Sequence, residues 1–222
     1  MPTRLVDRVP VAVVDAPAAR LVRRAADLAV AVTGLVALSP LWAAIALALR
    51  LSSREPVLYR QVRVGHRGRP FTLLKFRTMA GPADDTALRR QIAAELAGTA
   101  VAVDGSYKVD GDDRITRLGR LLRASSLDEL PQLLNVLAGD MALVGPRPSL
   151  PWEHELFPAE YRRRVSVKPG LTGLWQVSGR SRLSTPEMLQ LDLEYLERRS
   201  LGLDARILVR TLGVIVRGDG AR

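Results

Sequence analysis

The chain has 222 residues, 33 lysines and arginines and a formal net charge of +10, and its only lysines are Lys75, Lys108 and Lys168. The length suits one globular domain with an accessory segment, and the charge favours an anionic partner: anionic lipid, a phosphorylated substrate or nucleic acid. The absence of cysteine excludes disulfides, thiolate metal sites and a cysteine nucleophile. Aromatic residues are only 5% of the chain, which argues against the stacking sites of single-stranded nucleic-acid binders.

The N-terminal part is predicted to hold an extension followed by a membrane segment. Residues 1–19 contain three prolines and no periodic pattern, so we expect a loose or partner-dependent extension. The 22 residues from Leu28 to Leu49 are uncharged and mostly apolar; as a helix they would reach about 33 Å, enough to cross a bilayer core of about 30 Å. Ser39 and Pro40 interrupt this stretch, and the proline must kink or break a helix there.

Arginines flank the apolar stretch on both sides. Because the positive-inside tendency draws both ends to the cytoplasmic side, residues 20–50 are predicted to form a re-entrant hairpin that breaks at Ser39 and Pro40. A straight span, a signal peptide and a buried core helix are the alternatives. The long prefix and the lack of a small-residue cleavage site before Arg50 disfavour the signal peptide. The flanking arginines are Arg20, Arg23, Arg24, Arg50, Arg54, Arg60 and Arg63.

Two short strands, Val57 to Val64 and Phe71 to Met79, are predicted after the membrane segment. Lys75 and Arg77 alternate with apolar residues, so both cations are expected on one face of the second strand. Such a pair suits a diphosphate, because arginine grips oxygens bidentately while lysine acts as a point charge. A solvated basic face is the alternative.

Thr86 to Leu96 is predicted to be a helix, and a second helix follows with an apolar stripe opposite a row of arginines. The stripe is Ile115, Leu118, Leu121 and Leu122, and the row is Arg114, Arg117, Arg120 and Arg123. Some of these arginines are expected to contact lipid headgroups or substrate phosphate, with a solvated face as the alternative. The two histidines, His66 and His154, are predicted to be a turn residue and a surface residue rather than metal ligands.

Asp128 and Glu129 are adjacent carboxylates at the centre of the predicted site. Ser126 precedes Glu129 by three residues, the spacing of a capping box, which predicts a helix from Ser126 to Gly139 with Pro131 in its opening turns. Acidic residues in a first helical turn usually act as caps. The same helix N-terminus would also favour a bound phosphate, so capping and catalysis both remain open on the pattern alone.

Gly145 to Pro148 must form a rigid, non-helical turn, because each proline fixes its own φ and biases the residue before it. Arg147 is held between the two prolines, a suitable mount for contact with a phosphate or nucleobase. Residues 168–180 form another turn-rich segment, in which Trp175 is expected to pack within a loop.

The C-terminal third is predicted to hold two helices. The first, Pro186 to Arg198, is acidic and includes Asp192. The second is amphipathic and suits the headgroup layer of a membrane, with packing onto the core as the alternative. Its apolar face is Leu208, Leu212 and Ile215, and its basic face is Arg206, Arg210 and Arg217.

Four blocks of sequence together resemble the bacterial sugar transferases, the monotopic phosphoglycosyl transferases that start glycan assembly on a polyprenyl phosphate. The blocks are Leu58 to Met79, Asp112 to Arg123, Ser126 to Pro148 and Val167 to Ser181, and the resemblance spans roughly residues 20–215. It implies an α/β, mainly helical fold with a compact catalytic domain over residues 51–222, a re-entrant membrane helix and interfacial amphipathic helices. The chain is expected to be a minimal catalytic unit without the multi-span N-terminal region of larger relatives, and to lie at the cytoplasmic face of the bacterial inner membrane.

The same resemblance implies the chemistry. Asp128 would attack a UDP-sugar, expel UMP and hold the sugar phosphate covalently until undecaprenyl phosphate accepts it. Glu129, together with Asp128, would bind Mg²⁺. The other expected substrate-binding residues are Lys75, Arg77, Arg123, Arg147, Pro148 and, in an acidic role, Asp192. Anionic lipids are further expected partners and nucleic acid is not, and a homodimer is an option that the sequence leaves open.

A catalytically inactive membrane scaffold of a glycan assembly complex is the alternative function. It would explain the charge, the broken apolar helix and the amphipathic tail. It would not require two carboxylates and several matched cations to occur together in one chain. A nucleic-acid binder is supported only by the net charge and would be soluble, with steeply salt-dependent affinity.

Overall fold

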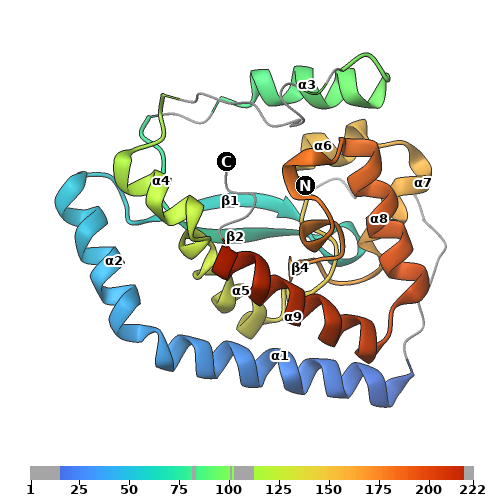
Figure 1. The fold of residues 1–222 in the computed structure, drawn as a ribbon, viewed down its shortest axis with the longest axis horizontal. Coiled ribbons are helices and arrows are strands. Elements are labelled where there is room, and N and C mark those ends of the chain that lie inside the picture. The colour runs from blue at the N-terminus through green and yellow to red at the C-terminus, as the bar shows by residue number, and fades with distance from the viewer. Residues whose placement is uncertain (1–15, 82–83, 101, 103–112, 218–222) are drawn as a thin grey trace.

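The computed structural model describes residues 16–81, 84–100, 102 and 113–217 (Figure 1). The predicted N-terminal extension lies almost entirely outside the described residues, and helix α1 already begins at Pro17. The described part is mainly helical, as predicted, and its short strands form two separate two-stranded sheets.

The apolar N-terminal stretch forms two helices, α1 (Pro17–Ala37) and α2 (Ser39–Ser52), which meet at a bend of 62°. Pro40 lies in the first turn of α2, where its missing N–H costs no helical hydrogen bond. The Ser39 hydroxyl donates to the carbonyl of Val36 at 2.8 Å and so satisfies one of the last carbonyls of α1. The break predicted at Ser39 and Pro40 is confirmed.

The bent pair has the length and composition of a broken span or a re-entrant loop, whereas no single helix of the described residues is long and apolar enough to cross a membrane. Figure 1 shows α1 along the lower edge of the molecule and α2 rising from its end. Both helices carry exposed apolar side chains, among them Leu21, Val36, Leu47 and Leu51.

The two predicted strands form an antiparallel hairpin, β1 (Leu58–Val64) and β2 (Pro70–Phe76), and this prediction is confirmed. Its register sets Tyr59 opposite Lys75. One face carries Phe76, which is buried against α2, where the ring of Trp42 meets it edge-on at 5.1 Å. The hairpin therefore fixes β2 between the broken helix and the centre of the domain.

A second, parallel sheet pairs β3 (Ala142–Val144) with β4 (Gly170–Thr172). The backbones after β3 and at the start of β4 approach so closely that an ideal Cβ built on Gly170 would lie 2.1 Å from the backbone nitrogen of Gly145. Only glycine fits at Gly170, and this contact joins two of the motif blocks identified in the sequence.

The remaining helices pack on the sheets or on one another. The helices predicted over Thr86 to Leu96 and in the acidic C-terminal segment are confirmed, and the second begins with a capping box in which Glu187 accepts from the amide of Ser184 at 2.7 Å. Their bounds are α3 (Thr86–Leu96), α4 (Arg117–Ala124), α5 (Gln132–Ala138), α6 (Pro151–Leu156), α7 (Ala159–Arg162), α8 (Thr185–Arg198) and α9 (Leu201–Arg217).

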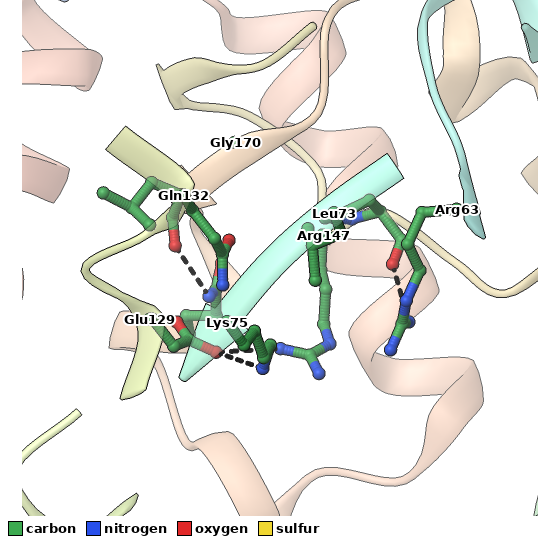
Figure 2. Close-up of a pocket in the computed structure, with 10 residues that line it drawn as sticks. Arg63, Leu73, Lys75, Glu129, Gln132, Arg147 and Gly170 are labelled. Atoms are coloured by element: carbon green, nitrogen blue, oxygen red, sulfur yellow. Dashed lines mark hydrogen bonds and ion pairs between the residues drawn. The ribbon is translucent and has the colours of Figure 1, made fainter. Parts of the chain in front are cut away.

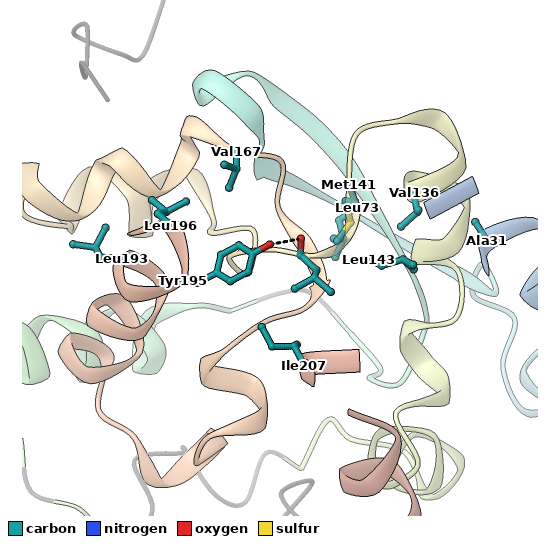
Figure 3. Packing of buried hydrophobic residues seen from close by; sticks show 11 residues of the cluster. Ala31, Leu73, Val136, Met141, Leu143, Val167, Leu193, Tyr195, Leu196 and Ile207 are labelled. Atoms are coloured by element: carbon teal, nitrogen blue, oxygen red, sulfur yellow. Dashed lines mark hydrogen bonds between the residues drawn. The ribbon is translucent and has the colours of Figure 1, made fainter. Parts of the chain in front are cut away.

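The main core lies among β2, β3, α5, α8 and α9 (Figure 3). Tyr195 of α8 is fully buried there, and its hydroxyl donates to Asp204 at 2.8 Å and to the carbonyl of Val144 at 3.3 Å. Helix α1 joins this core through Asp27, whose carboxylate accepts from the amide of Leu143 at 2.9 Å. The first half of the broken helix is thus bonded to β3, the strand that leads into the Gly145 to Pro148 turn.

Two predicted apolar stripes are only partly buried. Leu122 of α4 is buried, but Leu121 is 65% exposed. On α9 Asp204 and Ile207 are buried and Leu208 packs partly buried against the main core, while Leu212 is 66% exposed and the side chain of Ile215 lies outside the described residues. Packing onto the core is therefore wrong for Leu212, because α9 turns Ile207 inward instead.

Candidate active site

Asp128 and Glu129 lie in a short 3₁₀ turn, Leu127–Glu129, between α4 and α5. Ser126 precedes the turn with a left-handed backbone (φ 57°), and its side chain makes no capping hydrogen bond. A capping residue needs an extended backbone, so the predicted capping box and the helix beginning at Ser126 are wrong. Helix α5 starts only after Pro131, which is its N-cap residue and not, as predicted, part of its opening turns.

Glu129 lies in a cationic pocket (Figure 2). Its Oε1 accepts a hydrogen bond from Nζ of Lys75 at 2.9 Å and lies 3.8 Å from Nη1 of Arg147. Burial would raise the pKa of Glu129, but Lys75 and Arg147, with Arg180 adding to them, lower it to about 2. Glu129 is therefore ionised at neutral pH and its charge is matched by cations from β2 and from the turn after β3.

Asp128 has the opposite electrostatic character although it is the next residue along the chain. It is 8% exposed, and burial raises its pKa; Lys75 opposes this shift and the charge of Glu129 adds to it. A poorly solvated carboxylate of raised basicity is a better nucleophile than a solvated one. The two carboxylates are thus suited to different tasks.

Arg63 adds a third cation to the pocket, which Leu73 and Pro148 also line. The hairpin register sets Arg63 opposite Phe71 and Lys75 opposite Tyr59, so both cations lie on the same face. The sequence analysis did not predict Arg63 as a site residue. Its place in β1, two residues after Gln61 and four after Tyr59, puts it on the same face as Lys75 and could have indicated it. Three cations beside one carboxylate make the pocket suitable for an anionic ligand.

Two other predicted cations have different partners. Arg77 donates to the carbonyl of Pro56 at 2.9 Å and pairs with Glu55 at 3.2 Å. Arg123 contacts Sδ of Met79 at 3.5 Å, and its charge acts to lower the pKa of Asp128. The structure therefore brings Lys75, Arg147 and Pro148 together around Glu129, keeps Arg123 near Asp128, and pairs Arg77 with another carboxylate.

Asp192 is placed behind the Gly145 to Pro148 turn. It is 1% exposed, and its Oδ2 lies 2.5 Å from Nη2 of Arg164. Burial raises the pKa of Asp192 to about 6, with Arg164 acting to lower it. Its observed partner is this buried arginine, which the sequence did not single out.

His154 lies on α6 and is 4% exposed, so its prediction as a surface residue is wrong. Burial lowers its pKa to about 4, and the charges of Arg164 and Arg162 add to this shift. His66, in contrast, lies in the turn between β1 and β2, as predicted.

Asp128 and Glu129 could supply only part of the ligands of a magnesium ion. Among the described residues no group of three or more histidine, aspartate and glutamate side chains could hold a metal by itself. Mg²⁺ commonly binds through one or two carboxylates, substrate phosphates and water. Since Lys75 and Arg147 both contact Oε1 of Glu129, the donor set fits an ion that arrives with a diphosphate better than a permanently caged one.

Comparison with known proteins places the site in a family. Residues 18–218 match the bacterial sugar transferase family. The chain is 40% identical over 207 residues to the UDP-glucose:undecaprenyl-phosphate glucose-1-phosphate transferase of Caulobacter vibrioides, covering 90% of this chain and 71% of that protein. It is 35% identical over 208 residues to the exopolysaccharide production protein ExoY of Sinorhizobium fredii, covering 92% and 90%.

A third relative is longer. The chain is 40% identical over 168 residues to the galactosyl transferase CpsE of Streptococcus agalactiae, covering 75% of this chain but only 36% of that protein. The matched region thus spans about a third of CpsE and most of ExoY. With nearly the whole chain matched, this protein belongs to the bacterial sugar transferase family.

Proposed function

We propose that this chain transfers a sugar 1-phosphate from a UDP-sugar to undecaprenyl phosphate and releases UMP, in the service of exopolysaccharide or other cell-surface glycan synthesis. The observation that carries the proposal is the pairing of a buried carboxylate, Asp128, with an ionised Glu129 that is already surrounded by cations. Relatives named as undecaprenyl-phosphate transferases support the same reaction.

The first step is a displacement at the sugar-bearing phosphorus. A carboxylate oxygen of Asp128 forms a bond to this phosphorus, and the bond from phosphorus to the bridging oxygen breaks. UMP leaves with that oxygen and its electron pair, and the product is an acyl phosphate that carries the sugar. Lys75 and Arg147 would neutralise the diphosphate oxygens during this exchange.

The second step returns the enzyme to its starting state. A phosphate oxygen of undecaprenyl phosphate attacks the same phosphorus, and the bond between that phosphorus and the Asp128 oxygen breaks. The lipid then carries the sugar through a diphosphate, and Asp128 is again a free carboxylate. The raised pKa of Asp128 favours the attack in the first step, and the acyl phosphate bond is labile enough for the second.

Glu129 and Asp128 are the residues that would hold Mg²⁺. A bound magnesium ion would supply charge neutralisation to the diphosphate. Without the ion, the hydrogen bond from Lys75 keeps the Glu129 carboxylate ionised and holds it in place.

The bent pair α1 and α2 would dip into the cytoplasmic leaflet of the inner membrane and bring the acceptor lipid to the site. Its exposed leucines and valines would contact acyl chains, and the exposed flanking arginines, Arg20, Arg50, Arg54 and Arg60, would contact anionic headgroups. Assembly as a homodimer stays a prediction.

The test is UMP release by detergent-purified protein from a panel of UDP-sugars, with Mg²⁺ and undecaprenyl phosphate. We expect release from at least one donor, loss of release with EDTA, and loss in Asp128→Asn. Absence of release with every donor would contradict the transferase function and favour the inactive scaffold.

A further inference from the structure

The turn that carries Arg147 is bonded to the rest of the domain at every carbonyl from Pro146 to Ser149. The two outer carbonyls accept from backbone amides, those of Gly170 and Val64, each at 2.9 Å. The two inner carbonyls accept from guanidinium groups. Because prolines supply no N–H, the turn has few donors of its own and depends on these external ones.

Arg164 is the donor to the carbonyl of Arg147. Its Nη2 lies 2.6 Å from that oxygen and 2.5 Å from Oδ2 of Asp192. Arg164 is 6% exposed, and its guanidinium lies over the ring of Phe157 at 5.5 Å. Arg164 contacts the turn without lining the Glu129 pocket; with Arg147 and Pro148 it lines a second, smaller hollow.

The role of the buried pair is geometric rather than electrostatic. A buried arginine is strongly unfavourable unless it is paired, and Asp192 supplies the opposite charge. The pair therefore adds little net charge to the site. Both contacts come from the terminal Nη2 of the guanidinium. The nitrogen of a lysine ends one bond closer to the backbone, so a lysine at this position would not reach the Arg147 carbonyl and the Asp192 carboxylate in the same geometry.

Arg63 holds the next carbonyl from the other side. Its Nη1 donates to the carbonyl of Pro148 at 3.0 Å, and its side chain is fixed by two hydrogen bonds to Oε1 of Gln61, at 3.1 and 2.6 Å. Two buried guanidinium groups from different elements thus hold neighbouring carbonyls of one turn.

The backbone of the turn is therefore held by hydrogen bonds, whereas the side chain of Arg147 extends from it toward solvent. The side chain of Arg147 is 40% exposed and its Nη1 lies 3.8 Å from Glu129. The position of such a long side chain depends on where its backbone is held. A small shift of the turn would move the guanidinium away from Glu129 and from any diphosphate beside it.

We propose that Arg164, oriented by Asp192, is a positioning residue for Arg147: it fixes the Arg147 carbonyl so that the Arg147 guanidinium meets the diphosphate of the nucleotide sugar next to Glu129. This role deepens the proposed transferase function and rests on it. It also gives Asp192 a place in the site without contact to substrate.

A double-mutant cycle tests the proposal. Arg164→Lys, Arg147→Ala and the double variant are compared by the KM for the UDP-sugar and the kcat of UMP release. We expect Arg164→Lys alone to raise KM about tenfold with a smaller change in kcat, and the double variant to have the KM of Arg147→Ala alone. Arg163→Lys is the matched control, because the neighbouring Arg163 pairs with Glu197 instead of the turn, and its KM should equal that of wild type.

A purely structural role would lower the melting temperature or the active fraction and leave KM unchanged. If Arg164→Lys does not fold, Asp192→Asn replaces it in the same cycle. If the wild type is active and the KM of the double variant equals the product of the two single effects, Arg164 and Arg147 act independently and the positioning role is overturned. A wild type that releases no UMP would overturn the transferase function instead, and the cycle would then be read from the dissociation constant of UDP.

Discussion

The Nζ atom of Lys75 lies 2.9 Å from Oε1 of Glu129, so a strand of the hairpin and the turn after α4 meet in one largely buried ion pair. This pair orders the acidic turn. Glu129 is bonded to β2, whereas Asp128, the residue before it, is buried and has no ion pair within the described residues, with Lys75 and Arg123 acting on it from a greater distance. The different surroundings of the two carboxylates follow from the cations beside Glu129, Lys75 and Arg147, and from the burial of Asp128.

Replacement of Lys75 by methionine should therefore remove the cation that neutralises Glu129 and the contact that orders the turn Leu127–Glu129. We expect kcat/KM to fall about a hundredfold or more, and the free energy of unfolding to fall by about 1–3 kcal/mol, because Glu129 would keep a buried charge without its nearest partner. Arg77→Met is the comparison, since Arg77 pairs with Glu55, whose side chain is 39% exposed. Equal losses of activity in the two variants would contradict the assignment of Lys75 to the site.

Glu129→Gln should change the magnesium requirement. If Glu129 holds the ion that accompanies the diphosphate, the Mg²⁺ concentration for half-maximal UMP release should rise about tenfold or more. Glu55→Gln serves as control because Glu55 pairs with Arg77 outside the pocket. An unchanged magnesium titration in Glu129→Gln would remove Glu129 from the metal site.

The close contact between Gly145 and Gly170 should make substitution there costly. Gly170→Ala should lower the free energy of unfolding by at least about 2 kcal/mol, because the new methyl group would force the backbones of two motif blocks apart. Gly213→Ala on α9 has open space around it and should instead stabilise the protein by about 0.5–1 kcal/mol. Chemical denaturation measures both, and a neutral Gly170→Ala would contradict the packing of β3 on β4.

Stability should depend on pH through His154. Its pKa is about 4 in the folded protein and 6.5 ordinarily, so the unfolded chain binds the proton more readily between these values. The contribution of His154 is full above pH 6.5 and is lost as the pH falls toward 4, by about 2–3 kcal/mol. Asp192, with its raised pKa, acts in the opposite sense over nearly the same range.

The informative quantity is therefore the difference between wild type and His154→Gln, measured by denaturation from pH 7 to pH 4. This difference should shrink or change sign as the pH falls. A difference that stays constant would mean that His154 does not titrate in this range.

Local chemistry explains which elements could be predicted from the sequence. Pro40 marks the helix break, and the alternation of apolar residues marks β1 and β2. These signals operate over a few residues. Strand alternation indicates Lys75, the two flanking prolines indicate Arg147, and the resemblance to the family indicates the catalytic role of the acidic pair.

The parts that sequence reasoning missed depend on distant contacts. Ser126 has the spacing of a cap but adopts a left-handed conformation, because the turn is set by packing between α4, α5 and β2. Arg63 meets the carbonyl of Pro148 across 85 positions of the chain. The acidic role of Asp192 in the site stays a prediction, and its buried partner Arg164 is brought to it only by the fold.

The most direct test of the central claim is a single-turnover experiment with donor alone. Purified protein, Mg²⁺ and the active UDP-sugar are mixed without undecaprenyl phosphate, and UMP and the intact protein mass are measured together. Covalent catalysis by Asp128 predicts UMP in stoichiometric amount, a protein heavier by one sugar phosphate, and loss of both in Asp128→Asn. UMP that forms only after the acceptor is added, with no change in protein mass, would contradict the account.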